Sequence, residues 1–138
     1  MTPSNAPSTQ ARSIHVSAAV IVNDRDELLL VRKAGTTSFM QPGGKPEPGE
    51  TPDQTLSREL LEELGLAVDP ATLRPLGLFT AAAANEPGFL VVADVFAVDI
   101  EDQVPVIAAE IEELRWVSRA HAANLEIAPL ARENFLPG

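Results

Sequence analysis

The sequence contains no cysteine and no tyrosine among its 138 residues. Without cysteine the chain has no disulfide framework, no thiol nucleophile and no cysteine-based zinc or iron–sulfur site, so redox chemistry by its own side chains is not expected. It also lacks any apolar run near the ~20 residues that span a bilayer, and residues 1–13 lack the apolar segment of a signal peptide. We therefore expect a cytoplasmic protein that does not enter a membrane.

Basic residues are scarce as well, because 10 Lys and Arg stand against 20 Asp and Glu, for a net charge of −10. Nucleic-acid backbones attract basic stripes on a protein surface. We therefore expect no nucleic-acid binding and a small molecule as the partner. A small phosphate ester chelated by a metal ion remains compatible with this charge.

The length and composition indicate one domain with its own core, since 45% of the residues are hydrophobic and 22% are charged. We place that domain at residues 13–138. Residues 1–12 are rich in Pro, Ser, Thr and Ala and show no periodicity, which predicts a mobile N-terminal tail.

Runs of apolar and β-branched residues bounded by turn signals predict strands at residues 14–22, 27–33, 73–79, 89–100 and 112–117. The first two, joined by a turn at 23–26, are expected to form a hairpin. Small residues at 81–84 either leave room for a ligand or form a short helix or a packed turn. Short helices are expected at 119–124, capped by Ser118, and at 128–134. Strands around one strong helix indicate an α+β layered domain.

The stretch at residues 43–66 is the most informative part of the chain. Its first part holds three prolines and three glycines, which predict a shaped loop without regular structure: Pro42, Pro46, Pro48, Gly43, Gly44 and Gly49. A helix follows, with Thr51 as N-cap, Pro52 at the first position and Gly65 as terminator. Both helix ends are therefore marked.

This helix has an apolar face and an acidic face. The residues expected to be buried are Leu56, Leu60, Leu61 and Leu64. Glu59, Glu62 and Glu63 lie three and four positions apart, and like charges at such spacings cost ~0.2–0.5 kcal/mol per pair. A divalent cation such as Mg²⁺ or Mn²⁺, which prefers oxygen ligands, would remove this repulsion. Alternatively, the face is an ordinary solvated one, with Arg58 paired to Glu62.

Loop and helix together read G-x5-E-x7-R-E-U-x-E-E-x-G-U, where U is apolar. The matching residues are Gly44, Glu50, Arg58, Glu59, Leu60, Glu62, Glu63, Gly65 and Leu66. This run resembles the signature of the Nudix hydrolases at every defined position, and so many specified positions make a strong motif. Outside it the likeness is one of layout.

The resemblance implies a Nudix-type α/β/α sandwich with a mixed sheet and a central loop–helix motif. It also implies hydrolysis of a pyrophosphate bond in a nucleoside diphosphate linked to another group. Glu59, Glu62, Glu63 and the carbonyl of Gly43 are then the expected ligands of Mg²⁺ or Mn²⁺. Glu50 and Arg58 are expected to hold those carboxylates in place. Homodimers are common among relatives, and the sequence leaves the oligomeric state open.

The resemblance places substrate contacts at Gly44 and at the end of the second strand, where Arg32 and Lys33 either bind phosphates or are solvated strand ends. Phe39, Met40 and Gln41 are candidates to stack on or hydrogen-bond a base, although the first two residue types are more often core.

The general base is left open, because relatives recruit it from different places. Glu110 matches the position of an extra glutamate in some relatives, with Glu112 and Glu113 as rivals. His15 either faces the substrate from its strand or, as we expect for both His15 and His121, has a surface or packing role.

The substrate is inferred by elimination. The chain lacks the tyrosine of dinucleoside polyphosphate cleavers, has Ala82 where many ADP-ribose cleavers have proline, and lacks the upstream pattern of coenzyme A cleavers. A nucleoside or deoxynucleoside triphosphate, including an oxidised purine nucleotide, is the leading expectation. The alternatives are another nucleotide-linked or non-nucleotide diphosphate, or a non-catalytic nucleotide-sensing module.

Overall fold

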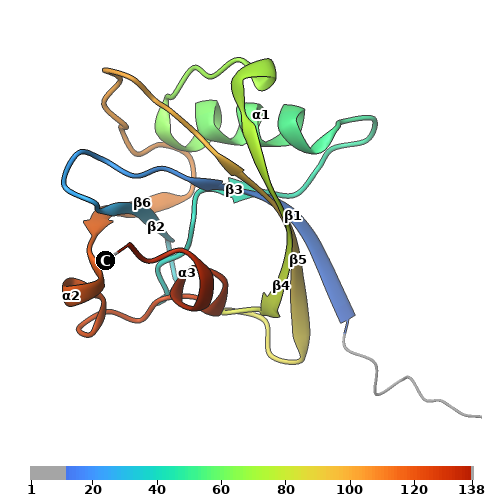
Figure 1. Cartoon of the computed structure of the whole chain (residues 1–138). Helices are drawn as coiled ribbons and strands as arrows, with labels where there is room; N and C mark the ends of the chain where they lie inside the picture. The colour runs from blue at the N-terminus through green and yellow to red at the C-terminus, as the bar shows by residue number, and fades with distance from the viewer. Residues whose placement is uncertain (1–11, 138) are drawn as a thin grey trace, which may run out of the picture.

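A computed structural model describes residues 12–137 of the chain. Figure 1 shows two sheets with helices around them. The elements, in chain order, are β1 (Arg12–Val20), β2 (Leu28–Lys33), β3 (Gly43–Gly44), α1 (Pro52–Leu64), the short 3₁₀ helix η2 (Pro70–Thr72), β4 (Arg74–Ala82), β5 (Phe89–Ala97), β6 (Ile111–Val117), α2 (Arg119–Ala122) and α3 (Pro129–Asn134).

The larger sheet has the order β3-β1-β5-β4, and the smaller one pairs β2 with β6. β1 is parallel to β5, whereas β3 and β4 are antiparallel to their neighbours. The larger sheet is therefore mixed, as expected.

Helices cover the sheets on both sides, which gives the expected α/β/α sandwich (Figure 1). On one side Leu56, Leu60 and Leu64 of α1 pack in a cluster with residues of β1 and β5. On the other side Leu130 of α3 packs with Ala18 and with residues of β4 and β5. β2 is buried on both faces, because its alternate leucines enter different clusters. Burial of this apolar area is the main stabilising contribution.

The structure places Gly43 and Gly44 in a strand, so the expectation that this part of the chain has no regular structure was wrong there. These residues pair with Ala18 and Ser17 of β1. The approach is so close that a Cβ on Gly43 would lie 2.0 Å from the carbonyl oxygen of Ser17. Glycine is thus needed for the pairing. The pairing fixes the loop against the sheet.

The expected N-terminal hairpin forms only at its tip. A bridge joins Val22 to Leu28, and Asn23 N–H donates to the carbonyl of Glu27 at 3.0 Å. Beyond the tip the chains separate, because β1 pairs within the larger sheet and β2 pairs with β6. Local sequence signalled the turn, but distant strands took up most of the pairing.

Helix α1 begins and ends where the caps predicted. Thr51 N–H donates to the side chain of Gln54 at 3.0 Å, and Gly65 closes the helix with φ of 66°. Three of the four predicted leucines are fully buried, but Leu61 is 57% exposed. The apolar stripe that faces the sheet is therefore narrower than expected.

Most other boundaries shift by a few residues. β1 begins at Arg12, β4 continues to Ala82 and β5 ends at Ala97 instead of residue 100. The N-cap at Ser118 is confirmed, since its side chain accepts a hydrogen bond from His121 N–H. The tail expected at residues 1–12 lies, except for Arg12, outside the described residues.

Candidate active site

A cleft of about 490 Å³ lies between one face of β1 and β5, the start of α3 and the segment after β4. Alternate residues of β1 reach it, because successive side chains of a strand point to opposite faces. One part of its lining is apolar and includes Ile14, Val16, Val91 and Leu130. Another part holds Gly44 and the charged residues Lys33, Lys45, Glu59 and Glu110. The sequence motif and an apolar pocket therefore share one cavity.

Glu59 and Glu63 lie one helical turn apart on α1, on the side that faces β3. Glu63 is only 2% exposed, and its Oε1 accepts a hydrogen bond from Gly43 N–H at 3.3 Å. Glu59 lies so close to Gly44 that a Cβ there would be 2.4 Å from its carboxyl carbon. The two glycines thus fit against two carboxylates.

These two carboxylates resist ionisation in the metal-free protein. Burial, reinforced by the charge of Glu59, raises the pKa of Glu63 to about 8. Burial also raises the pKa of Glu59, although Arg58 partly opposes the shift. A carboxylate pair of this kind is poised to accept a positive charge.

Arg58 joins the loop to the helix. Its Nε lies 2.6 Å from Glu50, and its Nη1 lies 3.2 Å from Glu59 and 3.3 Å from Glu62. Its Nη2 also donates to the carbonyl of Lys45 at 3.0 Å. Hydrogen bonds from Arg58 lower the pKa of Glu50 to about 2. Arg58 therefore fixes where the acidic side chains lie relative to the loop.

Glu62 differs from Glu59 and Glu63 because its side chain is half exposed. Among residues 12–137, no three His, Cys, Asp or Glu side chains meet in a complete metal-binding cluster. Mg²⁺ typically binds one or two carboxylates together with waters and substrate phosphates. The Glu59–Glu63 pair suits such an ion, and the ligand roles of Glu59, Glu62, Glu63 and the Gly43 carbonyl stay predictions.

Arg32 and Lys33 occupy different places. The guanidinium of Arg32 contacts Glu112 at 3.0 Å, Glu113 at 3.2 Å and the carbonyl of Thr36 at 2.9 Å. These hydrogen bonds, first that to Glu112, raise the pKa of Arg32. Lys33 instead lines the cleft, with Nζ 3.6 Å from Glu110.

Glu110 also lies in a different place from Glu112 and Glu113, the other two candidates for the general base. It lines the cleft, and its charge contributes to the raised pKa of Glu59 and of Glu63. The backbone carbonyl of Glu110 accepts a hydrogen bond from Ala34 N–H at 2.8 Å, which ties this loop to the end of β2. Glu112 and Glu113 are occupied by Arg32.

Neither histidine lines the cleft. His15 Nε2 lies 2.6 Å from Asp94 of β5, and His121 contacts Ser118. Phe39 is buried in the core, whereas Met40 and Gln41 line the cleft. Of the three residues expected to contact a base, only Met40 and Gln41 are therefore in a position to do so.

Sequence reasoning missed most of the cleft wall. Ile14, Val16 and Val91 come from two strands that pair in parallel, and Leu130 comes from a helix near the end of the chain. The alternation of apolar residues in β1 signalled one buried face but not what covers it. The small residues at 82–84 do line the cleft, as one of the two expectations had it.

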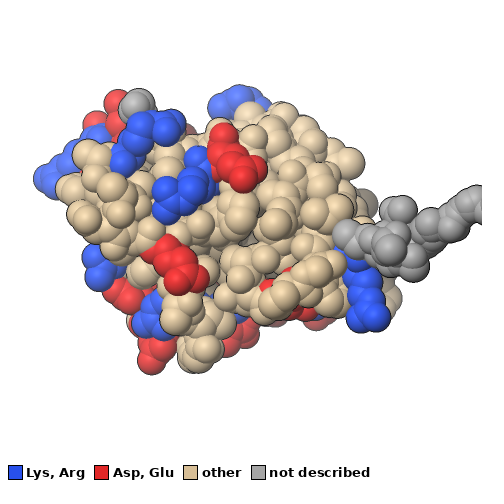
Figure 2. Space-filling model, turned by 90° about the horizontal axis from the view of Figure 1, so that it is seen from below, with Lys and Arg blue, Asp and Glu red and all other residues tan. Residues whose placement is uncertain are grey.

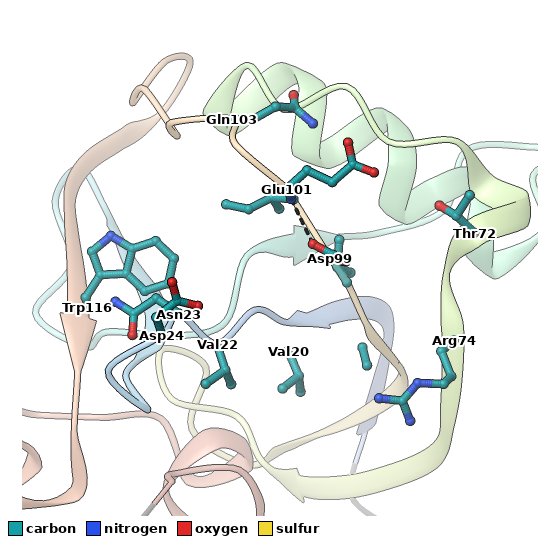
Figure 3. A pocket seen from close by; sticks show the side chains of 13 residues that line it. Val20, Val22, Asn23, Asp24, Thr72, Arg74, Asp99, Glu101, Gln103 and Trp116 are labelled. Carbon is teal, nitrogen blue, oxygen red and sulfur yellow. Dashed lines mark hydrogen bonds between the residues drawn. The ribbon is translucent and has the colours of Figure 1, made fainter.

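A second cavity, of about 770 Å³, lies elsewhere and holds none of the motif residues. Figure 3 shows its lining, which includes Trp116, Asp24, Asp99, Glu101 and Arg74. The Asp99 carboxylate accepts a hydrogen bond from Glu101 N–H at 2.8 Å. Its size alone does not make it the site of chemistry, because the other cleft is lined by Glu59, which lies one helical turn from the buried Glu63.

Charge is spread thinly over the side of the molecule that carries α3 and the β4–β5 connection. Figure 2 shows this side as mostly uncharged, with Lys, Arg, Asp and Glu at separate points. The acidic excess is therefore not gathered into one patch on this face.

A sequence profile of the NUDIX domain matches residues 13–137. The chain belongs to the NUDIX family. This Nudix chain also resembles solved structures. It is 30% identical to a NUDIX hydrolase from Nitrosomonas europaea, with a TM-score of 0.66, and the match covers 88% of this chain and 85% of that one.

Two curated relatives resemble part of the Nudix chain. It is 41% identical over 64 residues to an 8-oxo-dGTP diphosphatase of Haemophilus influenzae, which covers 44% of this chain and 47% of the relative. It is 49% identical over 47 residues to an RNA pyrophosphohydrolase of Yersinia enterocolitica, which covers 34% of this chain and 27% of the relative. The matches thus span less than half of these relatives' own length.

No helix within residues 12–137 combines the length and apolarity that a membrane crossing requires.

Proposed function

We propose that the protein is a divalent-metal-dependent hydrolase that cleaves a pyrophosphate bond in a nucleoside or deoxynucleoside triphosphate, releasing monophosphate and pyrophosphate. The observation that carries this proposal is the buried Glu63 beside Glu59, at the cleft and against Gly43. Burying a carboxylate among like charges opposes folding. Such a cost is understandable where the carboxylates serve a bound cation.

Glu59 and Glu63 would hold Mg²⁺ or Mn²⁺, with Glu62 and the carbonyl of Gly43 as further ligands. The ion supplies charge neutralisation at the phosphate oxygens and a more acidic water nucleophile. The chain's own part is to position groups. Arg58 and Glu50 fix the carboxylates relative to the loop.

Two cleft residues are proposed to act on the substrate directly. Lys33 is a phosphate contact, because its ammonium group lines the cleft. Glu110 is the general base that accepts a proton from the attacking water, because it lines the cleft and its charge helps to raise the pKa of both Glu59 and Glu63. Glu86 also lines the cleft, but we favour Glu110 for its closeness to the two helix carboxylates. Gly44 contributes its backbone at the phosphate end.

The relatives named as an 8-oxo-dGTP diphosphatase and an RNA pyrophosphohydrolase suggest two substrate classes, a free nucleotide and an RNA chain. The net charge of −10 opposes binding of an RNA chain. The apolar wall at Ile14, Val16 and Val91 suits a flat base. We therefore favour a free nucleotide, including an oxidised purine nucleotide, over RNA.

The test is a panel of nucleoside triphosphates, 8-oxo-dGTP, ADP-ribose and a 5′-triphosphate RNA oligomer, assayed with Mg²⁺ for monophosphate and pyrophosphate. The Glu63→Gln variant should lose at least about 100-fold in kcat, since even residues that support metal ligands account for ~10–100-fold. Its unfolding temperature without metal should not fall, because the amide avoids burying a charge and still accepts from Gly43 N–H.

The control is Asp53→Asn, which neutralises an acid in the first turn of the same helix that does not line the cleft, and it should leave kcat essentially unchanged. Nucleotide binding without turnover by the wild type would instead support a sensing module. Equal turnover by wild type and Glu63→Gln would exclude this carboxylate from the mechanism.

A further inference from the structure

Gln41 places an unused hydrogen-bond acceptor at the wall of the cleft. The residue is 7% exposed and lines the cavity. Its Nε2 donates to the carbonyl of Ala19 at 3.0 Å. Its Oε1, in contrast, is the one buried side-chain nitrogen or oxygen without a hydrogen-bond partner among residues 12–137.

The orientation of this amide is fixed by its partner. The carbonyl of Ala19 can only accept a hydrogen bond, so Nε2 must face it and Oε1 must be the free end. Turning the amide over would bring two acceptors together. The amide end that remains available is therefore an acceptor and not a donor.

The backbone around Gln41 is held on both sides. Met40 exchanges two hydrogen bonds of 2.8 Å with Val31, and the carbonyl of Pro42 accepts from Ala19 N–H at 2.9 Å. β3 begins at the next residue. The acceptor thus sits on a stretch that is tied to both sheets, two positions before the glycine that contacts Glu63.

The free end of the amide is buried and accepts no hydrogen bond from the described part of the chain. A buried acceptor without a partner destabilises a protein, and an apolar side chain of similar size would avoid that loss. Because Oε1 is covered in the free chain, a ligand gains from uncovering it only if the ligand brings a donor. This arrangement discriminates between ligands by hydrogen-bonding type.

We propose that Gln41 is a specificity-determining residue whose Oε1 accepts a hydrogen bond from N7–H of an oxidised purine base. The inference rests on the proposed nucleotide hydrolysis and adds the choice of base. In a purine, N7 carries a lone pair and would repel this oxygen. Oxidation at C8 turns N7 into an N–H donor with little change in shape. The residue therefore favours an 8-oxopurine over the ordinary purine.

The experiment compares kcat/KM for 8-oxo-dGTP, dGTP and 7-deaza-dGTP, whose position 7 has neither a donor nor a lone pair. Wild type should prefer 8-oxo-dGTP to dGTP by about 10-fold or more, with 7-deaza-dGTP between them, since sites built for a hydrogen bond reject analogues that lack it. In Gln41→Leu the value for 8-oxo-dGTP should fall about 10-fold. In the same variant, kcat/KM for dGTP and kcat/KM for 7-deaza-dGTP should differ by no more than about 3-fold.

Gln103→Leu is the matched control, because it removes a glutamine amide that bonds to Ala67 outside the cleft. It should leave all three ratios unchanged. Turnover of dGTP by Gln41→Leu reports that the variant is folded, and Gln41→Met provides a second apolar replacement if the leucine variant loses all activity.

The outcomes separate the two proposals. Turnover of dGTP and 8-oxo-dGTP at equal rates by wild type, or an unchanged preference in both Gln41 variants, would overturn the role of Gln41 and leave nucleotide hydrolysis standing. Failure of wild type to hydrolyse any nucleotide in the panel would overturn the proposed function, and the role of Gln41 with it.

Discussion

Gly44 leaves the space that the carboxylate of Glu59 occupies. A Cβ on Gly44 would lie 2.4 Å from both the carboxyl carbon and Oε2 of Glu59. Real Cβ atoms do not approach other atoms so closely, so any larger residue must move the carboxylate. The glycine of β3 and the acid of α1 are thus complementary in shape as well as close in space.

We expect Gly44→Ala to lower kcat about 10- to 100-fold, because small misplacements at a reacting centre have effects of this size. The free energy of unfolding should change by less than ~1 kcal/mol, since the end of a glutamate side chain can swing away. Steady-state kinetics and thermal unfolding of the same preparation check both parts. Full activity in this variant would show that the position of Glu59 is not critical.

Gly43→Ala is the contrasting control for that variant. There the added Cβ would lie 2.0 Å from the Ser17 carbonyl oxygen, which belongs to backbone and cannot swing away. We expect this substitution to disrupt the β1–β3 pairing and lower the unfolding temperature clearly more than Gly44→Ala does.

Acid should weaken the link between Glu50 and Arg58. Because the folded state lowers the pKa of Glu50 to about 2, the stabilisation is complete above the unfolded pKa near ~4.5 and is lost as the pH falls toward 2. In Glu50→Gln the pair is absent at every pH. The unfolding temperatures of wild type and variant should therefore differ at pH 7 and converge near pH 2.

The measurement is thermal unfolding in buffers from pH 7 to pH 2 without divalent metal. Glu47→Gln serves as the comparison, since that residue lies 3.6 Å from Arg58 and is 63% exposed. A Glu50→Gln difference that stays constant over the whole range would show that charge pairing is not its cause.

Lys33 and Arg32 should give opposite results although they are neighbours. We expect Lys33→Ala to raise KM for the nucleotide about 10-fold with little effect on unfolding, because a hydrogen bond to a charged group contributes ~1.5–3 kcal/mol and Lys33 lines the cleft. Arg32→Ala should instead lower the unfolding temperature, because it removes contacts to β6 and to Thr36. Kinetics and thermal unfolding of both variants decide the matter, and the reverse pattern would make Arg32 the phosphate contact.

Glu110→Gln should lower kcat by ~10²–10⁴-fold, the usual contribution of a general base. KM should change little, because the amide keeps the shape of the side chain. Glu112→Gln is the control, since Glu112 is bound to Arg32 and does not line the cleft. A pH–rate profile unchanged by Glu110→Gln would assign proton transfer to another group.

Much of the site was predictable because its key residues are close in sequence. The helix ends at Thr51 and Gly65 and the buried leucines follow from local spacing and capping. The positioning roles of Glu50 and Arg58 were expected only from the family resemblance, and the structure adds the contact between them. Leu61 shows the limit of that reasoning. A helical stripe has a predictable width, but how much of it is covered depends on the sheet below it.

The errors arose where strands chose partners far away in the sequence. The two-residue strand at Gly43–Gly44 and the opening of the expected hairpin both depend on strand register, and so does the separation of Glu110 from Glu112 and Glu113, which the sequence had left open. A shift of one residue moves a side chain to the other face of a sheet. Sequence composition contains little information about that choice.

The sequence by itself determined the capped helix and the carboxylates spaced along it, because backbone preferences and helical periodicity act over a few residues. The tertiary structure alone decided that Glu63 is buried against Gly43, that Lys33 and Glu110 share a cleft with Glu59, and that Gln41 keeps a free acceptor there. The positions of these side chains depend on how β1 pairs with β3 and β5 and on which elements pack against that sheet. Contacts between residues far apart in the sequence decide the pairing and the packing.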